Sequence, residues 1–469
     1  MLFQSQIFLL VFLPLVLGGY YLAARYSRRV GDSTRKWLLV IASLWFYGYW
    51  DLRLLPLLLL SILANWVFAR LYPTHGRYLL TLGVVLNLVL LGIFKYADFF
   101  ANTVAFLFGT THEDWNIILP LAISFFTFQQ ISYLVDLRRK KAPTYSLLDY
   151  TLYISFFPQL IAGPIVRHHE IIGQFSLDPV REGLGERMGK GLTLLVIGLV
   201  KKVFLADPLG LIANPLFGQA AEGAILTFGE AWTAAFAYTF QLYYDFSSYS
   251  DMAIGMGLMF GFTLPLNFDS PYKAATIRDF WRRWHMTLTR FLRDYVYTPV
   301  GLSLPRKDKV LRESAATMVT MTLIGAWHGA AWSYVVFGAM HGVALIVDQT
   351  WVRLRLHLPH IVGWFLTFMF VAVTLVLFRS EDFAVSAQMW SAMVGMDGLN
   401  LDVGALRQND FLLILTGALI AFLGPNSQTI ALERLRPMRL AAVTSGLGLL
   451  AVLIQIGGSR DVEFIYFQF

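Results

Sequence analysis

The sequence contains no cysteine among its 469 residues. This absence excludes a disulfide framework, a thiolate metal site and a thioester formed on a side chain of the protein itself. The sequence also lacks a G-x-S-x-G nucleophile elbow and an H-E-x-x-H metal-binding helix, because His168-His169-Glu170 does not provide a histidine pair at i and i+4. We therefore expect no metal, and acyl chemistry would need another nucleophile or a direct transfer.

Charged residues are scarce as well. They make up 14% of the sequence, against about 25% in a typical soluble domain, and hydrophobic residues make up 57%, against roughly 45–50%. A soluble domain could not bury this much apolar surface, because large domains divide into smaller ones first. The composition predicts a polytopic membrane protein in contact with lipid.

The net charge of +7 would suggest a nucleic-acid partner in a soluble protein. No basic stripe interleaved with stacking aromatic residues is present, so we expect no nucleic acid to bind. The sequence also has no internal repeat, no low-complexity linker and no long hydrophilic stretch. We therefore expect a single membrane-embedded domain over residues 1–469, all-α, with about ten to thirteen membrane segments.

Apolar runs alternate with charged loops in the first third of the sequence. Basic clusters follow the first, third and fifth runs, and acidic residues lie in the loop after the fourth. The positive-inside rule then predicts that the N-terminus is outside. The first run is not read as a signal peptide, because its positive charges follow it. The five runs are 7–24, 37–50, 54–71, 78–94 and 117–135.

The pattern becomes irregular after residue 141. Residues 150–163 are too few to cross the membrane as a helix, and Pro158 and Gly163 interrupt them. Residues 191–200 are also apolar for only a short stretch. Such segments are tolerated at membrane depth where they line a cavity, so we expect re-entrant or half-crossing helices near a functional cavity.

Residues 223–246 can span the membrane and lead into a segment with two carboxylates, Asp245 and Asp251. In apolar surroundings both must be paired or hydrogen-bonded. A structural polar cluster and a direct chemical role both remain open.

Residues 276–297 have the periodicity of one amphipathic helix. Aromatic residues share one face, while Arg278, Arg282, His285 and Arg293 fall on another. Such a helix either lies in the headgroup region or presents its basic face to an anionic substrate.

Five further apolar runs follow, and His341 lies inside one of them. The runs are 315–326, 333–351, 361–378, 411–424 and 440–456, followed by an aromatic tail at 464–469. An imidazole roughly 12 Å into a membrane helix is costly and typically faces a functional cavity. The flanking Gly338 and Gly342 indicate either close helix packing or room for a narrow substrate.

His328 precedes Gly329, where we expect a break between two helices. A structural role near a membrane interface is favoured, because on one continuous helix the two imidazoles would point roughly 220° apart. A neutral imidazole such as that of His341 could take a proton from an attacking hydroxyl. These residue types fit both a transferase and a transporter with a proton-coupling histidine.

Several motifs occur together in a characteristic order. They are residues 157–164, 241–255, 280–285, 327–329 and 338–342. Over nearly its whole length the sequence resembles the membrane-bound O-acyltransferase family, in the branch that O-acetylates alginate and, more distantly, the branch that D-alanylates teichoic acid.

The resemblance implies a ring of helices around a central tunnel in the bacterial inner membrane. It implies that His341 is the catalytic histidine and His285 the second required residue, with His328, Asp245 and Asp251 as possible supporting residues. It also implies acetyl-CoA as a cytoplasmic donor, no bound cofactor, a polysaccharide acceptor and separate periplasmic acetyltransferase proteins. Arg278, Arg282 and Arg293 would attract the CoA phosphates.

Four alternatives remain open from the sequence. Two share the chemistry: O-acetylation of bacterial cellulose, and D-alanyl transfer to teichoic acid. The other two are a polysaccharide exporter or proton-coupled transporter, and a scaffold that only docks a periplasmic acetyltransferase.

Overall fold

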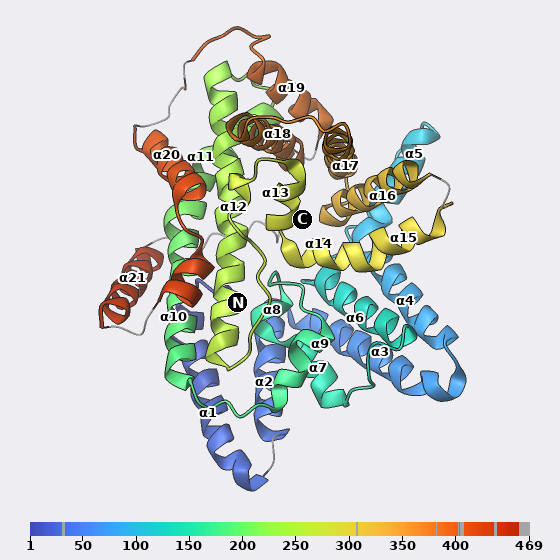
Figure 1. The fold of residues 1–469 in the computed structure, drawn as a ribbon, viewed down its shortest axis with the longest axis vertical. Coiled ribbons are helices and arrows are strands. Elements are labelled where there is room, and N and C mark those ends of the chain that lie inside the picture. Colours follow the sequence, from blue (N-terminus) through green and yellow to red (C-terminus); the bar gives the residue numbers. More distant parts are fainter. Residues whose placement is uncertain are drawn as a thin grey trace. The chain divides into compact units, whose positions relative to one another are not determined.

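The structure is a computed structural model that describes residues 1–30, 33–305, 308–380, 382–401, 403, 408–435 and 439–458. Every regular element in these ranges is helical, which confirms the predicted all-α class (Figure 1). The side chains of residues 26–30 and the predicted aromatic tail at 464–469 lie outside the described residues.

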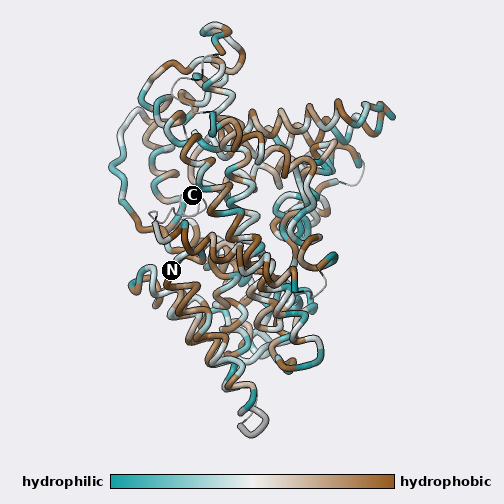
Figure 2. Tube along the Cα trace, turned by 90° about the vertical axis from the view of Figure 1, so that its left-hand side faces the viewer, coloured by the Kyte–Doolittle hydropathy of each residue, from teal (hydrophilic) through white to brown (hydrophobic). Residues whose placement is uncertain are grey.

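Six helical segments in the described ranges are long and apolar enough to cross a membrane. All six coincide with predicted apolar runs, which confirms a multi-pass membrane protein. Figure 2 shows apolar residues along the long helices and hydrophilic residues mostly at turns and ends. The count of ten to thirteen segments, the central tunnel and the outside N-terminus stay predictions. The six segments are Phe8–Arg25, Leu52–His75, Tyr78–Leu107, Trp332–Arg353, His360–Ser380 and Arg439–Gly458.

The chain forms two compact units. Among the described residues, unit 1 comprises 1–199, 249–266 and 427–458, and unit 2 comprises 200–248 and 267–426. Helix α10 (Leu184–Lys201) begins in unit 1, whereas α12 (Phe228–Met259) begins in unit 2 and ends in unit 1. The expected single domain over residues 1–469 stays a prediction.

Unit 1 contains the helices of the first third of the chain. They are α1 (Leu13–Val30), α2 (Ser33–Gly48), α3 (Leu55–His75), α4 (Tyr78–Leu91), α5 (Ala97–Leu107), α6 (Ile123–Arg138), α7 (Leu147–Ser155), α8 (Phe157–Leu160) and α9 (His168–Ile171), together with α21 (Arg439–Gly458). The predicted run 117–135 is helical only from Ile123, because Pro120 and the left-handed Ala122 precede it. The structure confirms the interruption in 150–163, where the buried α7 and α8 are separated at Phe156.

Unit 2 contains the elements that carry the predicted site. They are α11 (Asp207–Ala221), α13 (Ile277–Arg283), α14 (Met286–Leu292), α15 (Thr298–Ser303), α16 (Lys309–His328), α17 (Trp332–Arg353), α18 (His360–Ser380), α19 (Phe383–Met393) and α20 (Gln408–Leu423). The predicted span 223–246 was too short, because α12 continues to Met259. Residues 191–200 likewise belong to a longer helix, α10.

The prediction of one amphipathic helix over 276–297 was wrong. Figure 1 shows α13 and α14 as separate helices. Helix α13 ends at Arg283, and His285 takes a left-handed conformation with φ 43° and ψ 53° before α14 begins. The N–H of Met286 donates to the backbone oxygen of Asn267 at 2.9 Å instead of continuing the helix. A helical wheel drawn over residues 276–297 therefore combines the faces of two separate helices.

Helices α16 and α17 pack closely through glycine. A Cβ added to Gly338 would overlap the carbonyl oxygen of Met321, and one added to Gly342 would lie 2.8 Å from the Met318 sulfur. Of the two explanations for these glycines, the structure supports close helix packing. This packing fixes the helix that carries His341.

We predict that Gly338→Ala lowers the thermal unfolding temperature in detergent, because overpacking of a tight contact costs about 1–3 kcal/mol. The matched control is Gly218→Ala on α11, where an added Cβ meets nothing within 4 Å. Alanine should leave stability unchanged or raise it there, since it favours helix by about 0.5–1 kcal/mol over glycine. Equal effects of the two substitutions would contradict this account of the packing.

Candidate active site

A small cavity in unit 2 brings His328 and His341 together. Its walls are mainly aromatic side chains, including Trp281, Trp284 and Phe378. Its volume is about 20 Å³, which is room for about one water molecule. An acyl group can enter only if side chains around the cavity move.

His341 lies on α17 and is 1% exposed. The indole N–H of Trp281 donates to its Nδ1 at 3.2 Å. Its Nε2 lies 3.1 Å from Oγ1 of Thr374 on α18. Two helices besides its own therefore hold the imidazole, while the predicted depth of His341 in the membrane stays a prediction.

His285 is fully buried, which corrects the prediction that it shares a basic face with the arginines. Its Nδ1 lies 3.0 Å from Oδ1 of Asn267. The same oxygen accepts from the backbone N–H of Thr287 at 3.3 Å and from the Thr287 hydroxyl at 2.8 Å. Asn267 therefore holds both the imidazole and the start of α14.

The surroundings of His285 are apolar. The Phe246 ring meets it edge-on with centroids 4.7 Å apart, and no described residue hydrogen-bonds its Nε2. Burial lowers the pKa of His285 to about 3, so this imidazole is neutral at physiological pH. A left-handed backbone at a residue other than glycine is costly, and such strain often occurs at functional sites.

His328 ends α16, and the predicted break at Gly329 is confirmed. The chain reverses at this break, and His328 and His341 therefore line the same cavity. One continuous helix would have pointed the two imidazoles in different directions. Phe378 connects the two histidines through ring contacts. Its ring centroid lies 5.1 Å from that of His328 and 5.0 Å from that of Phe337. The Phe337 centroid in turn lies 4.5 Å from that of His341. The structural role favoured for His328 stays a prediction.

Asp245 belongs to a buried ion cluster. The Lys202 ammonium lies 2.6 Å from Asp245 and 2.7 Å from Asp207. Burial alone would lower the pKa of Lys202, but the two carboxylates outweigh it and raise that pKa. Asp251, in unit 1, accepts from the side-chain amide of Gln428 at 2.8 Å. Each carboxylate thus has a structural partner, and neither lines the cavity at His341.

The three predicted donor-binding arginines do not share one helix face, because the segment is broken. Arg278 pairs with Asp348 on α17 at 3.1 Å, and Arg293 pairs with its neighbour Asp294 at 2.9 Å. Arg282 is exposed. Their proposed role toward CoA stays a prediction.

Two groups of side chains in unit 1 could hold a metal ion: Asp136 with His168 and His169, and Asp98 with His112 and Asp114. The ligand atoms of Asp136, His168 and His169 lie within 4.8 Å of one another. Both nitrogens of His168 already have protein partners, since Nε2 lies 3.2 Å from Asp136 and Nδ1 lies 2.9 Å from the Tyr145 hydroxyl. The expected absence of a metal remains untested.

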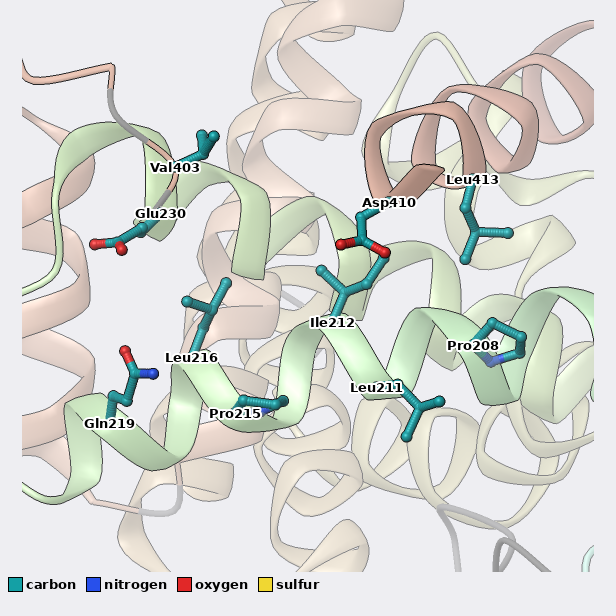
Figure 3. A pocket seen from close by; sticks show the side chains of 10 residues that line it. All are labelled: Pro208, Leu211, Ile212, Pro215, Leu216, Gln219, Glu230, Val403, Asp410 and Leu413. Carbon is teal, nitrogen blue, oxygen red and sulfur yellow. The ribbon is translucent and has the colours of Figure 1, made fainter. Parts of the chain in front are cut away.

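A larger cavity of about 330 Å³ lies beside α11 (Figure 3). Its walls are mostly apolar, and its carboxylates are Glu230 and Asp410. Glu230 accepts from the backbone N–H of Thr227 at 2.9 Å, as a helix-capping residue does. No histidine lines this cavity, so its chemistry does not match that around His341.

Comparison with known proteins decides the family. The membrane-bound O-acyltransferase family matches residues 137–380, which include all three site histidines. The chain is 40% identical over 448 residues to a peptidoglycan O-acetyltransferase of Helicobacter pylori, covering 88% of this chain and 83% of that protein. The chain belongs to the membrane-bound O-acyltransferase family.

Two further relatives place it within the membrane-bound O-acyltransferases. A probable alginate O-acetylase of Pseudomonas aeruginosa is 39% identical over 409 residues, covering 84% of this chain and 75% of that protein. A teichoic acid D-alanyltransferase of Streptococcus thermophilus is 28% identical over 253 residues, covering 52% and 60%. The chain is an acyltransferase of the O-acetyltransferase branch, so the exporter and transporter alternatives are not supported.

Three residues of the site were not predicted as functional from the sequence. Trp281 and Thr374 hold His341, and Asn267 holds His285. Trp281 lies in a motif that marked the family, but nothing in the motif indicated that its indole reaches α17. Asn267 and Thr374 lie in segments with no local signal, because their roles depend on tertiary contacts.

We predict that Asn267→Ala destabilises the protein by about 1–3 kcal/mol, because the buried donors of His285 and Thr287 lose their acceptor. Thermal unfolding in detergent measures the effect. Asn102→Ala is the control, since the Asn102 amide donates to Asp114 at the surface, 2.8 Å away. If Asn267→Ala lowered the unfolding temperature no more than Asn102→Ala does, Asn267 would not hold the site.

Proposed function

We propose that this membrane-bound O-acyltransferase takes acetyl groups from acetyl-CoA on the cytoplasmic side and passes them across the bacterial inner membrane to an exopolysaccharide such as alginate. The observation that carries the proposal is His341, a buried imidazole between Trp281 and Thr374 on a helix apolar enough to span the membrane. The alginate relative supports the acceptor class.

The chemistry that fits this site is direct transfer to a hydroxyl. The hydroxyl oxygen attacks the thioester carbon, a C–O bond forms, and the C–S bond breaks. The hydroxyl proton ends on the departing sulfur, so the products are an ester and a free thiol. The absence of cysteine means that no side chain of the protein forms a thioester in between.

The acceptor has a second candidate. The relative from Helicobacter pylori is a peptidoglycan O-acetyltransferase and covers 88% of this chain, so peptidoglycan is an alternative acceptor. D-alanyl transfer has less support, because that relative covers only 52% of the chain. Bacterial cellulose remains an alternative acceptor.

The donor and partner proposals extend the same scheme. Arg278, Arg282 and Arg293 are proposed to attract the CoA phosphates, since guanidinium groups bind phosphate strongly. Arg282 and Arg293 are exposed, and Arg278 is half-buried. The N-terminus is proposed to lie outside, and separate periplasmic acetyltransferase proteins are proposed to assist acetylation of the polymer.

We predict that His341→Ala abolishes acetylation in inverted membrane vesicles supplied with labelled acetyl-CoA, with the loss reaching about 10²-fold or more. The vesicles come from the native host lacking its own copy of the gene, so that partners and polymer are present. Label on the isolated polymer is measured, and labelled acetyl phosphate in a parallel sample tests the choice of donor.

His357→Ala is the matched control, because His357 is an exposed histidine beyond the end of α17. It should leave acetylation unchanged at equal protein level in the membrane. Full polymer acetylation by His341→Ala would refute the assignment and favour a scaffold that only docks a periplasmic enzyme.

A further inference from the structure

We propose that the two buried histidines have opposite, fixed tasks: His341 donates a hydrogen bond from Nε2 to the reacting carbonyl oxygen, and His285 accepts the hydroxyl proton at Nε2. The proposal rests on the acyl transfer of the proposed function. It assigns the proton-accepting role to His285, whereas the sequence favoured His341 for that role.

The tautomer of His341 follows from its two partners. An indole N–H can only donate, so Nδ1 of His341, 3.2 Å from Trp281, must be unprotonated. A neutral imidazole then carries its proton on Nε2. Thr374 agrees with this arrangement, because its hydroxyl donates to the backbone oxygens of Phe370 and Val371 at 2.9 and 3.0 Å. The Thr374 oxygen is therefore free to accept from His341 at 3.1 Å.

His285 has the other tautomer. Oδ1 of Asn267 accepts from the backbone N–H of Thr287, so this atom is the amide oxygen and acts as an acceptor. Nδ1 of His285, 3.0 Å away, must then carry the proton. The remaining nitrogen, Nε2, has a lone pair and no hydrogen-bond partner among the described residues.

A buried lone pair without a partner is costly, which indicates that a ligand group completes it. His285 is 0% exposed, and burial keeps its pKa low, so the lone pair is not occupied by a proton at rest. The backbone strain at His285 adds a second cost that the contacts of Asn267 must offset. Asn267 and Trp281 are thus positioning residues that act through the two imidazoles.

The two histidines belong to one cluster of rings. The His285 ring lies 6.2 Å from Trp327, which lies 5.0 Å from His328 in the cavity wall. Trp284, next to His285 in the chain, lines the same cavity as His341. His285 itself does not line that cavity, so a substrate reaches its Nε2 only when aromatic side chains between the two imidazoles move.

The step balances as follows. The acceptor hydroxyl gives its proton to Nε2 of His285, directly or through one bound water, while its oxygen attacks the thioester carbon. The carbonyl oxygen becomes an oxyanion and replaces Thr374 as the acceptor of the Nε2–H of His341. The oxyanion reforms the C=O bond, the C–S bond breaks, and the thiolate takes the proton back from His285.

Amide substitutions separate the two tasks, because a side-chain amide can donate a hydrogen bond but is not a base at neutral pH. His341→Gln keeps a hydrogen-bond donor near the position of Nε2, so its acetylation rate should stay within about 10-fold of wild type. His341→Ala has no such donor, and its acetylation rate should fall about 10²–10³-fold. The acetylation rates of His285→Gln and His285→Asn should both fall about 10²–10⁴-fold, because neither amide is a base. His285→Asn keeps a donor near Nδ1 for Asn267, so its unfolding temperature controls for folding. Acetylation in the vesicle assay is the readout.

The opposite ranking would overturn the proposal: His341→Gln as inactive as His341→Ala, with His285→Gln active. Nitrogen-15 NMR of histidine-labelled protein in lipid gives an independent readout. It should show Nδ1 of His341 and Nε2 of His285 unprotonated. Trp281→Phe should allow both tautomers of His341 to be populated, because the indole donor to Nδ1 is removed. Trp390→Phe should leave the tautomer of His341 unchanged, since the Trp390 indole donates to the backbone oxygen of Val373.

The NMR result does not depend on the donor. Reversed tautomers in a protein that acetylates its polymer would contradict this inference and leave the proposed function standing. The assigned tautomers in a protein that does not use acetyl-CoA would instead contradict the proposed donor alone.

Discussion

Burying an imidazole among aromatic side chains costs free energy unless its nitrogens have hydrogen-bond partners. This constraint explains the residues around the site better than any motif does. Trp281 and Thr374 satisfy His341, and Asn267 satisfies one nitrogen of His285. The exception is Nε2 of His285, and an unsatisfied buried atom of this kind calls for an explanation. Substrate binding supplies one.

Glycine contacts set the distances on which these bonds depend. The donor–acceptor distance of a hydrogen bond can vary by only a few tenths of an ångström, so the separation of α16 and α17 must be well defined. Gly338 and Gly342 allow that approach, since any Cβ there would meet Met321 or Met318. Close packing and catalysis are therefore served by the same helix. A side chain that separates the two helices would also move His341 away from Trp281.

Sequence reasoning succeeded where the signal was local or compositional. The apolar runs and the break at Gly329 both follow from hydropathy and single residues. It failed for His285, because a helical wheel assumes one uninterrupted helix. The interruption comes from Asn267, which lies in the loop before α13 and takes the N–H groups that α13 would have used. No property of residues 276–297 alone contains that information.

The central claim is that acyl transfer takes place between His341 and His285, and a structure with a bound, non-reactive acyl-thioester analogue tests it most directly. The account predicts that the analogue's carbonyl oxygen lies about 3 Å from Nε2 of His341, in place of the Thr374 hydroxyl. An acyl group bound elsewhere, such as in the larger cavity beside α11, with the contacts of both histidines unchanged, would contradict it.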